Sequence, residues 1–182
     1  PAAPALQPAD MPALHVQQSA GTVTVSGADF SLAFDEAEGT LASFRYRDAE
    51  LIERGPLLNV WRAPTNNDEG QSWSVQSAHS WRKAGLDRLR HQVKSVDVTL
   101  VSPQVVQVKV QSNVSAPDQP VIPSEAAVIP SEHGCTHPRI LNQGSHCEYT
   151  YTIYGSGDVL LDTRVVPSQN LPPLPRIGLQ MV

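Results

Sequence analysis

Histidine and cysteine residues gather in the second half of the chain, where they could bind a metal ion. His133, Cys135 and His137 alternate, and His146 is followed directly by Cys147. Imidazole and thiolate groups are the usual ligands of zinc. However, ordinary zinc loops separate their paired ligands by about two to four residues, and neighbours on a strand face opposite sides. We therefore favour a solvated loop with incidental histidines and predict no metal site in this chain.

Acidic residues could supply the paired carboxylates on which many hydrolytic enzymes rely, one of them with a raised pKa. Asp68 and Glu69 are adjacent, so their side chains diverge on an extended segment. Asp35, Glu36 and Glu38 fall in a predicted turn, where carboxylates serve local hydrogen bonding and solvation. Neither group marks a catalytic pair, and we predict no catalytic residue in this chain.

The segment GPLLNVWRAPTNNDEG at residues 55–70 joins an apolar strand to a polar turn. Pro64 fixes the exit from the strand, and the Asn and Asp side chains that follow can hydrogen-bond an irregular backbone. Gly70 frees the backbone for a hinge or a close approach. Arg62 precedes the turn, and we predict that it holds the loop by pairing with Asp68. Composition alone favours a rigid loop over a binding site.

Short alternating segments predict the strands that must position these residues. Residues 22–25, 30–34 and 41–46 alternate between Gly/Asp-containing turns, which indicates an antiparallel meander. The same pattern returns at 93–100, 105–110, 149–154 and 159–166, and the Gly-Ser-Gly-Asp turn at 155–158 predicts a hairpin between the last two. Another strand begins within residues 175–182.

One helix and two irregular segments complete the prediction. Residues 74–84 favour a short helix, with Gly85 placed to end it. The Pro- and Ala-rich residues 1–12 resemble a linker, and the polar, Pro-rich residues 115–145 predict a long surface loop. The fold class is therefore all-β.

Composition excludes several classes of partner. The formal net charge of −5 argues against a nucleic-acid or membrane-surface partner, because either would select a basic face. Cys135 and Cys147, the 2 cysteines, do not form a disulfide framework, and free thiols are favoured over a bridge. The start at Pro1 and the end at Val182, within a strand-like pattern, lead us to expect part of a longer polypeptide without its own signal peptide.

The segment at 55–70, followed by Trp81 and AGLD at 84–87, resembles the signature of the C-terminal small-chain domain of family 2 β-galactosidases. The resemblance extends to FD at 34–35 with GTL at 39–41, to YTIYGSG at 151–157 and to LPRIG at 174–178. It covers roughly residues 22–182 in order and spacing.

This resemblance implies an antiparallel, galactose-mutarotase-like supersandwich, of which residues 13–182 form only the N-terminal part. In this family both catalytic glutamates of a retaining mechanism lie on a separate (β/α)8 barrel. The chain alone is therefore expected to be inactive and to border the mouth of the active site. The residues expected nearest that mouth are Arg62, Asn67, Asp68, Gly70 and Trp73.

The resemblance also implies the setting of the whole enzyme. Such enzymes often use Mg²⁺ and a monovalent cation bound mainly elsewhere, so no cofactor is expected in this chain. The expected partners are the remaining domains, above all the catalytic barrel, and a galactoside such as lactose; the parent could also be a homo-oligomer. A cytoplasmic location is expected from the few cysteines and the lack of a signal.

Two departures and two alternatives stay open. The family more often has Asp where this chain has Asn66, and the segment at 115–145 has no clear family counterpart. An independent carbohydrate-binding module could use Trp61, Trp73 or Trp81 as a stacking platform, with Trp73 expected to be exposed and the others to pack in the core. An aldose-1-epimerase-like enzyme is the other alternative, and it needs a His and a Glu as acid and base.

Overall fold

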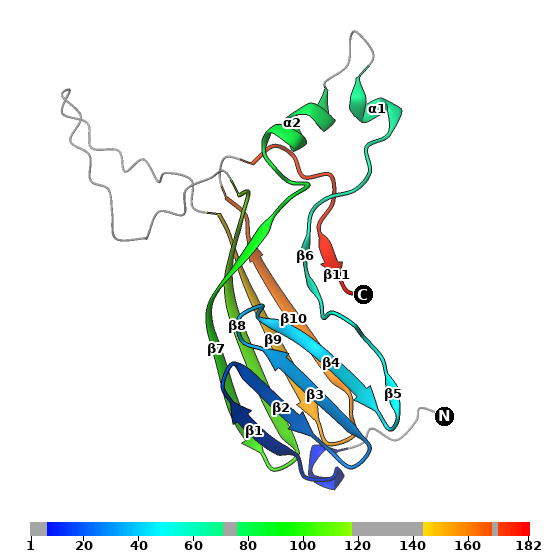
Figure 1. Ribbon diagram of the computed structural model, residues 1–182, viewed down its shortest axis with the longest axis vertical. Helices are drawn as coiled ribbons and strands as arrows, with labels where there is room; N and C mark the ends of the chain where they lie inside the picture. Colours follow the sequence, from blue (N-terminus) through cyan, green and yellow to red (C-terminus); the bar gives the residue numbers. More distant parts are fainter. Residues whose placement is uncertain (1–6, 71–75, 118–143, 169–170) are drawn as a thin grey trace, which may run out of the picture.

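The computed structural model describes residues 7–70, 76–117, 144–168 and 171–182. Two antiparallel sheets face each other, and a short two-stranded ribbon with two helices covers one end (Figure 1). The all-β, sandwich-like fold class expected from the sequence is confirmed. The predictions made from the sequence for Trp73, His133, Cys135 and His137 concern residues outside the described ranges.

The first sheet is a five-stranded meander in which each strand pairs with the next. Its strands are β1 (His15–Ser19), β2 (Thr22–Ser26), β3 (Phe30–Asp35), β4 (Thr40–Tyr46) and β5 (Ala49–Glu50). The predicted meander of β2, β3 and β4 is confirmed. The prediction missed β1 because all of its positions are exposed, so no buried face imposes an alternating pattern.

The second sheet has four strands in the order β10-β9-β8-β7, all antiparallel. They are β7 (Arg90–Ser102), β8 (Val105–Ser115), β9 (Ser145–Tyr154) and β10 (Val159–Val166). The hairpin predicted between the last two strands is confirmed, since the N–H of Gly157 donates to Tyr154 O at 2.9 Å. The first and last residues of the loop expected at 115–145 belong to strands, because β8 reaches Ser115 and β9 starts at Ser145.

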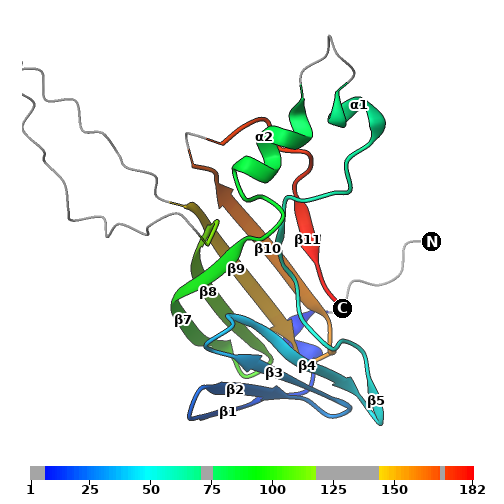
Figure 2. The same cartoon turned by 45° about the horizontal axis from the view of Figure 1, so that its top comes forward.

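Alternate residues of the two sheets build the core between them. β9 buries Tyr149, Tyr151 and Ile153 on one face, while the intervening residues are half-buried on the other. The Phe34 ring of β3 meets the Tyr151 ring edge-on with centroids 5.0 Å apart, so the contact joins the two layers. Figure 2 shows the five-stranded sheet lying across the four-stranded one. The period-two pattern of the sequence thus corresponds to one buried face per sheet.

A ribbon covers the part of the four-stranded sheet that the meander leaves open. It pairs β6 (Leu57–Asn59) with β11 (Gly178–Gln180) in antiparallel register. The backbone N–H of Leu58 donates to the hydroxyl of Tyr149 at 3.0 Å, which fastens the ribbon to β9. The strand predicted within 175–182 is confirmed as β11.

The helices lie beyond this ribbon, and one of them was not predicted. The predicted helix is present as α2 (Ser77–Lys83), and Gly85 ends it with a φ of 70°. A second, four-residue helix, α1 (Asn66–Glu69), occupies a stretch that we expected to be irregular. The reason is local, because Thr65 and Asp68 have the spacing of a capping box.

The chain before β1 contacts the sandwich. A 3-10 helix, η1 (Pro8–Asp10), precedes Leu14, which is 7% exposed and whose N–H donates to Pro103 O at 2.7 Å. The residues from 7 onward therefore include a stretch held by hydrogen bonds. The assignment of residues 1–12 as a linker stays a prediction.

Candidate functional site

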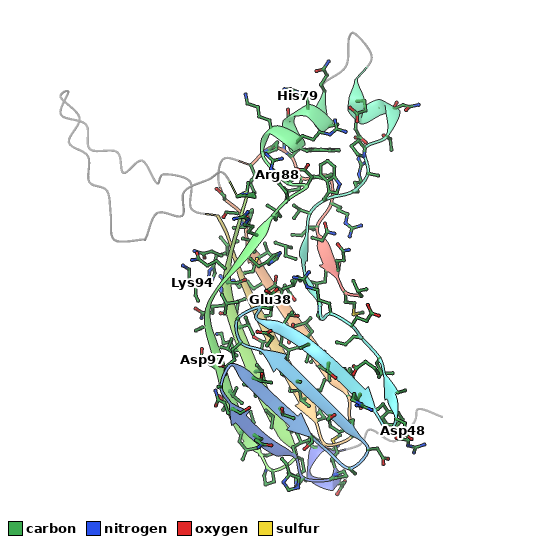
Figure 3. All side chains as sticks on the ribbon, in the orientation of Figure 1. Glu38, Asp48, His79, Arg88, Lys94 and Asp97 are labelled. Atoms are coloured by element: carbon green, nitrogen blue, oxygen red, sulfur yellow. The ribbon has the colours of Figure 1, made fainter. Side chains whose placement is uncertain are left out.

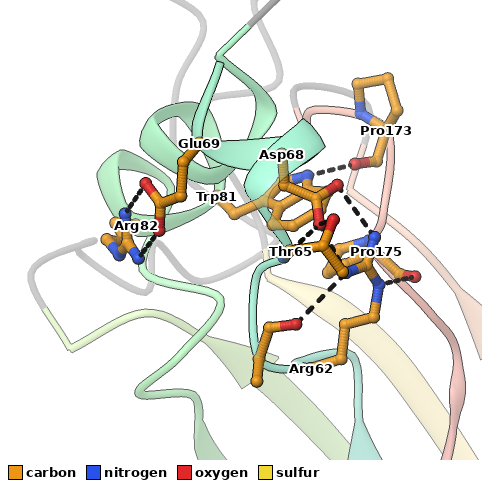
Figure 4. A network of polar contacts seen from close by, with 9 residues as sticks. Arg62, Thr65, Asp68, Glu69, Trp81, Arg82, Pro173 and Pro175 are labelled. Atoms are coloured by element: carbon orange, nitrogen blue, oxygen red, sulfur yellow. Dashed lines mark hydrogen bonds and ion pairs between the residues drawn. The ribbon is translucent and has the colours of Figure 1, made fainter. Parts of the chain in front are cut away.

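Arg62 and Asp68 are joined by a two-pronged ion pair at the end of β6. Arg62 Nη1 lies 2.7 Å from Asp68 Oδ2, and Arg62 Nη2 lies 3.0 Å from Asp68 Oδ1 (Figure 4). Two parallel N–H···O bonds between a guanidinium and a carboxylate fix the relative orientation of both groups. The pairing predicted from the sequence is confirmed, and we call it the Arg62–Asp68 clamp.

The Asp68 carboxylate also closes the first turn of α1. Its Oδ2 accepts hydrogen bonds from the backbone N–H and from the hydroxyl of Thr65, each at 2.7 Å. The hydrogen bonds from Arg62 and then from Thr65 hold the pKa of Asp68 well below its usual range. The same carboxylate raises the pKa of Arg62. Both groups are therefore charged at neutral pH, and the loop between them is held at both ends.

Arg62 links this loop to two further parts of the chain. Its Nε donates to Pro175 O at 3.3 Å, and its guanidinium carbon lies 5.0 Å from the centre of the Trp81 ring. Trp81, which is 4% exposed, donates from Nε1 to Pro173 O at 2.9 Å. The side chains of α2 and the segment leading to β11 thus meet at the clamp. Trp61 packs edge-on against Trp81 with centroids 6.4 Å apart, so both rings serve packing as expected.

Glu69 forms a second ion pair that ties α1 to α2. Its Oε1 lies 2.5 Å from Arg82 Nη2, and its Oε2 lies 3.0 Å from Nη1 (Figure 4). These hydrogen bonds lower the pKa of Glu69. Asp68 and Glu69 therefore point to different partners, as expected, although they diverge from a helix rather than from an extended segment. Neither carboxyl group has the raised pKa that a general acid requires.

The residues expected near an active-site mouth fall into distinct roles. Arg62 and Asp68 are half-buried and engaged with each other, whereas Asn66 and Asn67 are exposed on α1. Gly70 follows the helix with a φ of 76°, a backbone conformation that favours glycine. The clamp therefore presents a helix with amide side chains to the outside. Whether this surface borders a substrate stays a prediction.

The acidic and sulfur-containing residues that are described offer no assembled metal site. Within the described ranges, no group of three or more His, Cys, Asp or Glu side chains lies close enough to hold an ion. His146 is exposed and Cys147 is buried, so the two point to opposite sides of β9 as expected. Burial raises the pKa of Cys147 to about 11, which disfavours the thiolate that a metal would need. These residues do not fit a metal ion.

Sequence reasoning missed the connections made across long stretches of chain. Trp81 and Pro173 are separated by 92 residues, and Arg62 and Pro175 by 113. The acceptors are backbone carbonyls, which carry no residue-specific signal. For Glu69 and Arg82 the only signal in the sequence was their opposite charge.

Comparison with known protein families identifies the family to which these residues belong. The family described as the β-galactosidase small chain matches residues 26–182. This chain belongs to that family. The match includes the clamp, α2 and both ribbon strands. The resemblance to the β-galactosidase small chain that the sequence indicated is therefore confirmed over residues 26–182.

Relatives from several bacteria are much longer than this chain. The β-galactosidase of Priestia megaterium is 32% identical over 168 residues, which span 92% of this chain and 13% of that relative. The β-galactosidase of Psychromonas ingrahamii is 30% identical across 87% of this chain and 14% of its own length. That of Halalkalibacterium halodurans is 41% identical over 78 residues. The small-chain sequence thus spans about one seventh of the first two relatives.

Among the helices of the described ranges, none has both the length and the apolar character needed to cross a membrane.

Proposed function

We propose that this chain is a non-catalytic part of a β-galactosidase that hydrolyses terminal β-D-galactosides such as lactose. It supports one wall of the active site, while the catalytic carboxylates belong to another domain. The family match and the small share of each relative that the chain spans support this proposal. The chain alone is expected to be inactive.

The observation that carries the proposal is the Arg62–Asp68 clamp. It fixes α1 through the end of β6, through Trp81 of α2 and through the carbonyl of Pro175. Such anchoring is what a wall needs, because polar groups that meet a substrate must hold their positions to within a fraction of an ångström. Asn67 and the neighbouring Gly70 are the groups that we propose to lie toward the pocket, together with Trp73.

The ion pairs of Asp68 and Glu69 are the reason that we assign the catalytic carboxyl groups to another domain. A retaining glycosidase uses one carboxyl group as acid and base and another as nucleophile, about 5 Å apart. Asp68 and Glu69 instead have lowered pKa values, and each is bound by an arginine. We propose that the two catalytic glutamates lie on a (β/α)8 barrel in the rest of a family 2 enzyme.

Further features of the whole enzyme belong to the same proposal. The chain forms the first part of a galactose-mutarotase-like supersandwich, and its main partner is the catalytic barrel. Mg²⁺ and a monovalent cation act in the parent and are bound mainly by residues outside this chain. The parent works in the cytoplasm, and a homo-oligomer is the expected assembly.

Kinetics of the whole enzyme test the role of the clamp. Asp68→Asn and Arg62→Lys each remove the paired geometry, so α1 loses an anchor and kcat/KM for a chromogenic β-galactoside should fall by about tenfold or more. Arg47→Ala is the matched control, since Arg47 pairs with Asp29 at 3.7 Å far along the chain from the clamp. Unchanged kinetics in both clamp variants would remove the support for a wall. Hydrolysis by the chain alone would refute a non-catalytic role.

A further inference from the structure

A cavity separate from the clamp opens between the β6–β11 ribbon and the start of β7. Its volume is about 320 Å³, within the lower part of the range typical of small-molecule sites. Leucine side chains and Val182 supply its apolar part. Its polar and aromatic lining comes from Arg54, Asn59, Trp61, Asp87, Arg88 and Gln180.

Each arginine of this cavity stands beside a carboxylate. Arg54 Nη2 lies 3.0 Å from Glu38 Oε2, and Arg88 Nη1 lies 3.1 Å from Asp87 Oδ1. Figure 3 places Arg88 toward the helical end of the molecule and Glu38 nearer the five-stranded sheet. Asp87 belongs to the lining, whereas Glu38 lies outside it, so each arginine has a carboxylate partner in or next to the cavity. A simple anion would need an excess of positive charge, which these pairs do not provide.

His91 adds no positive charge to the lining of the cavity at neutral pH. It also lines the cavity, at the start of β7, and burial lowers the pKa of its imidazole from the usual value. The ring is therefore mainly neutral at pH 7. The cavity is polar without carrying a strong net charge.

Two amides form the polar part of the lining that belongs to the ribbon. Asn59 Nδ2 donates to Gln180 Oε1 across the two strands, and Asn59 Oδ1 accepts the backbone N–H of Trp61 at 2.7 Å. A carboxamide both donates and accepts hydrogen bonds, as a hydroxyl does. The ring of Trp61, which is half-buried, contributes an apolar aromatic wall next to these amides. Aromatic surface beside groups that donate and accept matches a ligand with an apolar face and several hydroxyls.

We propose that this cavity binds one hexose unit, with galactose as its ligand. Trp61 packs against the C–H face of the sugar, and Asn59, Gln180 and Asp87 bind its hydroxyls. The choice of galactose over other hexoses rests on the proposed function. The site is a second sugar-binding position, distinct from the wall formed around the clamp.

Direct titration of the 182-residue chain with galactose tests this proposal. We expect saturable quenching of Trp fluorescence with a Kd on the order of millimolar, and saturation-transfer NMR signals from the sugar C–H protons. Asp87→Ala should weaken binding by about tenfold, because it removes a hydrogen bond to a charged group, and Gln180→Ala should weaken it by about fivefold, because the lost hydrogen bond is to a neutral amide. Arg47→Ala removes another ion-paired surface arginine and should leave the Kd unchanged.

Three results would overturn the site. They are the absence of saturable binding, an unchanged Kd in both cavity variants, and tighter binding of sulfate than of galactose. Circular dichroism establishes that each variant is folded; Gln180 is exposed on β11, so its variant decides the matter if Asp87→Ala unfolds. The wall proposal fails by a different measurement, the kinetics of clamp variants in the whole enzyme. The failure of one proposal can therefore be distinguished from the failure of the other.

Discussion

The carboxylate of Asp68 binds both terminal nitrogens of Arg62 and both donors of Thr65 at distances of 2.7 to 3.0 Å. One carboxylate thus completes an ion pair and caps a helix at the same time. Because Arg62 also contacts Trp81 and Pro175, the conformation of α1 depends on residues far away in the sequence.

Acidification should lower the free energy of unfolding of the chain, in part through protonation of Asp68. A carboxyl group whose pKa is lowered by folding contributes stability that is complete above its unfolded pKa of about 3.9. That contribution is lost as the pH falls through the lower pKa of the folded state. The Asp68→Asn variant should therefore have a lower free energy of unfolding than the unmodified chain at pH 7. This difference should shrink below about pH 4.

Urea unfolding over a pH series measures this difference. Other carboxylates with lowered pKa values, such as Glu69 and Glu148, are common to both proteins and cancel in the comparison. Parallel stability curves from pH 7 to pH 2 would show that the clamp carboxylate is not coupled to folding.

Removal of the Trp81 indole should have two separable effects. Trp81→Phe loses the Nε1 hydrogen bond to Pro173 O and part of the ring, and should cost about 1–3 kcal/mol of unfolding free energy. Trp81→Ala also leaves a cavity beneath Arg62 and Trp61 and should cost about 3–5 kcal/mol. Guanidinium unfolding followed by far-UV circular dichroism distinguishes the two. Equal losses would mean that the ring volume contributes nothing at this position.

Gly85 is predicted to be intolerant of any side chain. Its φ is 70°, and a Cβ atom there would lie 2.5 Å from the Cβ of Ala116. Gly21 has a φ of 79° with nothing within 4 Å of such an atom, so Gly21→Ala measures the backbone cost alone, about 1 kcal/mol. Gly85→Ala should add about 1–3 kcal/mol to that cost because of the clash. Similar thermal unfolding of the two variants would contradict the packing at the end of α2.

The thiol of Cys147 should be nearly inert in the folded chain. It is buried on β9, and burial raises its pKa to about 11, so little thiolate exists at pH 8. In a Cys135→Ser background, Ellman's reagent should react with Cys147 far more slowly in buffer than in guanidinium. Comparable rates in the two conditions would show that this face of β9 is open to solvent.

Local patterns were sufficient for much of the fold. The alternation of Tyr149, Tyr151 and Ile153 predicted β9 because each strand of a two-layer sandwich buries every second residue. The Arg62–Asp68 clamp could be predicted because its two members are six residues apart on either side of a rigid turn. The exposed strand β1 and the short helix α1 were missed, since neither carries a periodic buried face.

The sequence by itself determined the family, the all-β fold class and the pairing of Arg62 with Asp68, because these depend on local spacing and composition. Only the tertiary structure decided which backbone carbonyls Arg62 and Trp81 reach, and that Asn59 and Gln180 line one cavity with Trp61. Those contacts join segments about a hundred residues apart. They depend on how the chain topology brings distant segments together, and no local pattern of residues predicts that arrangement.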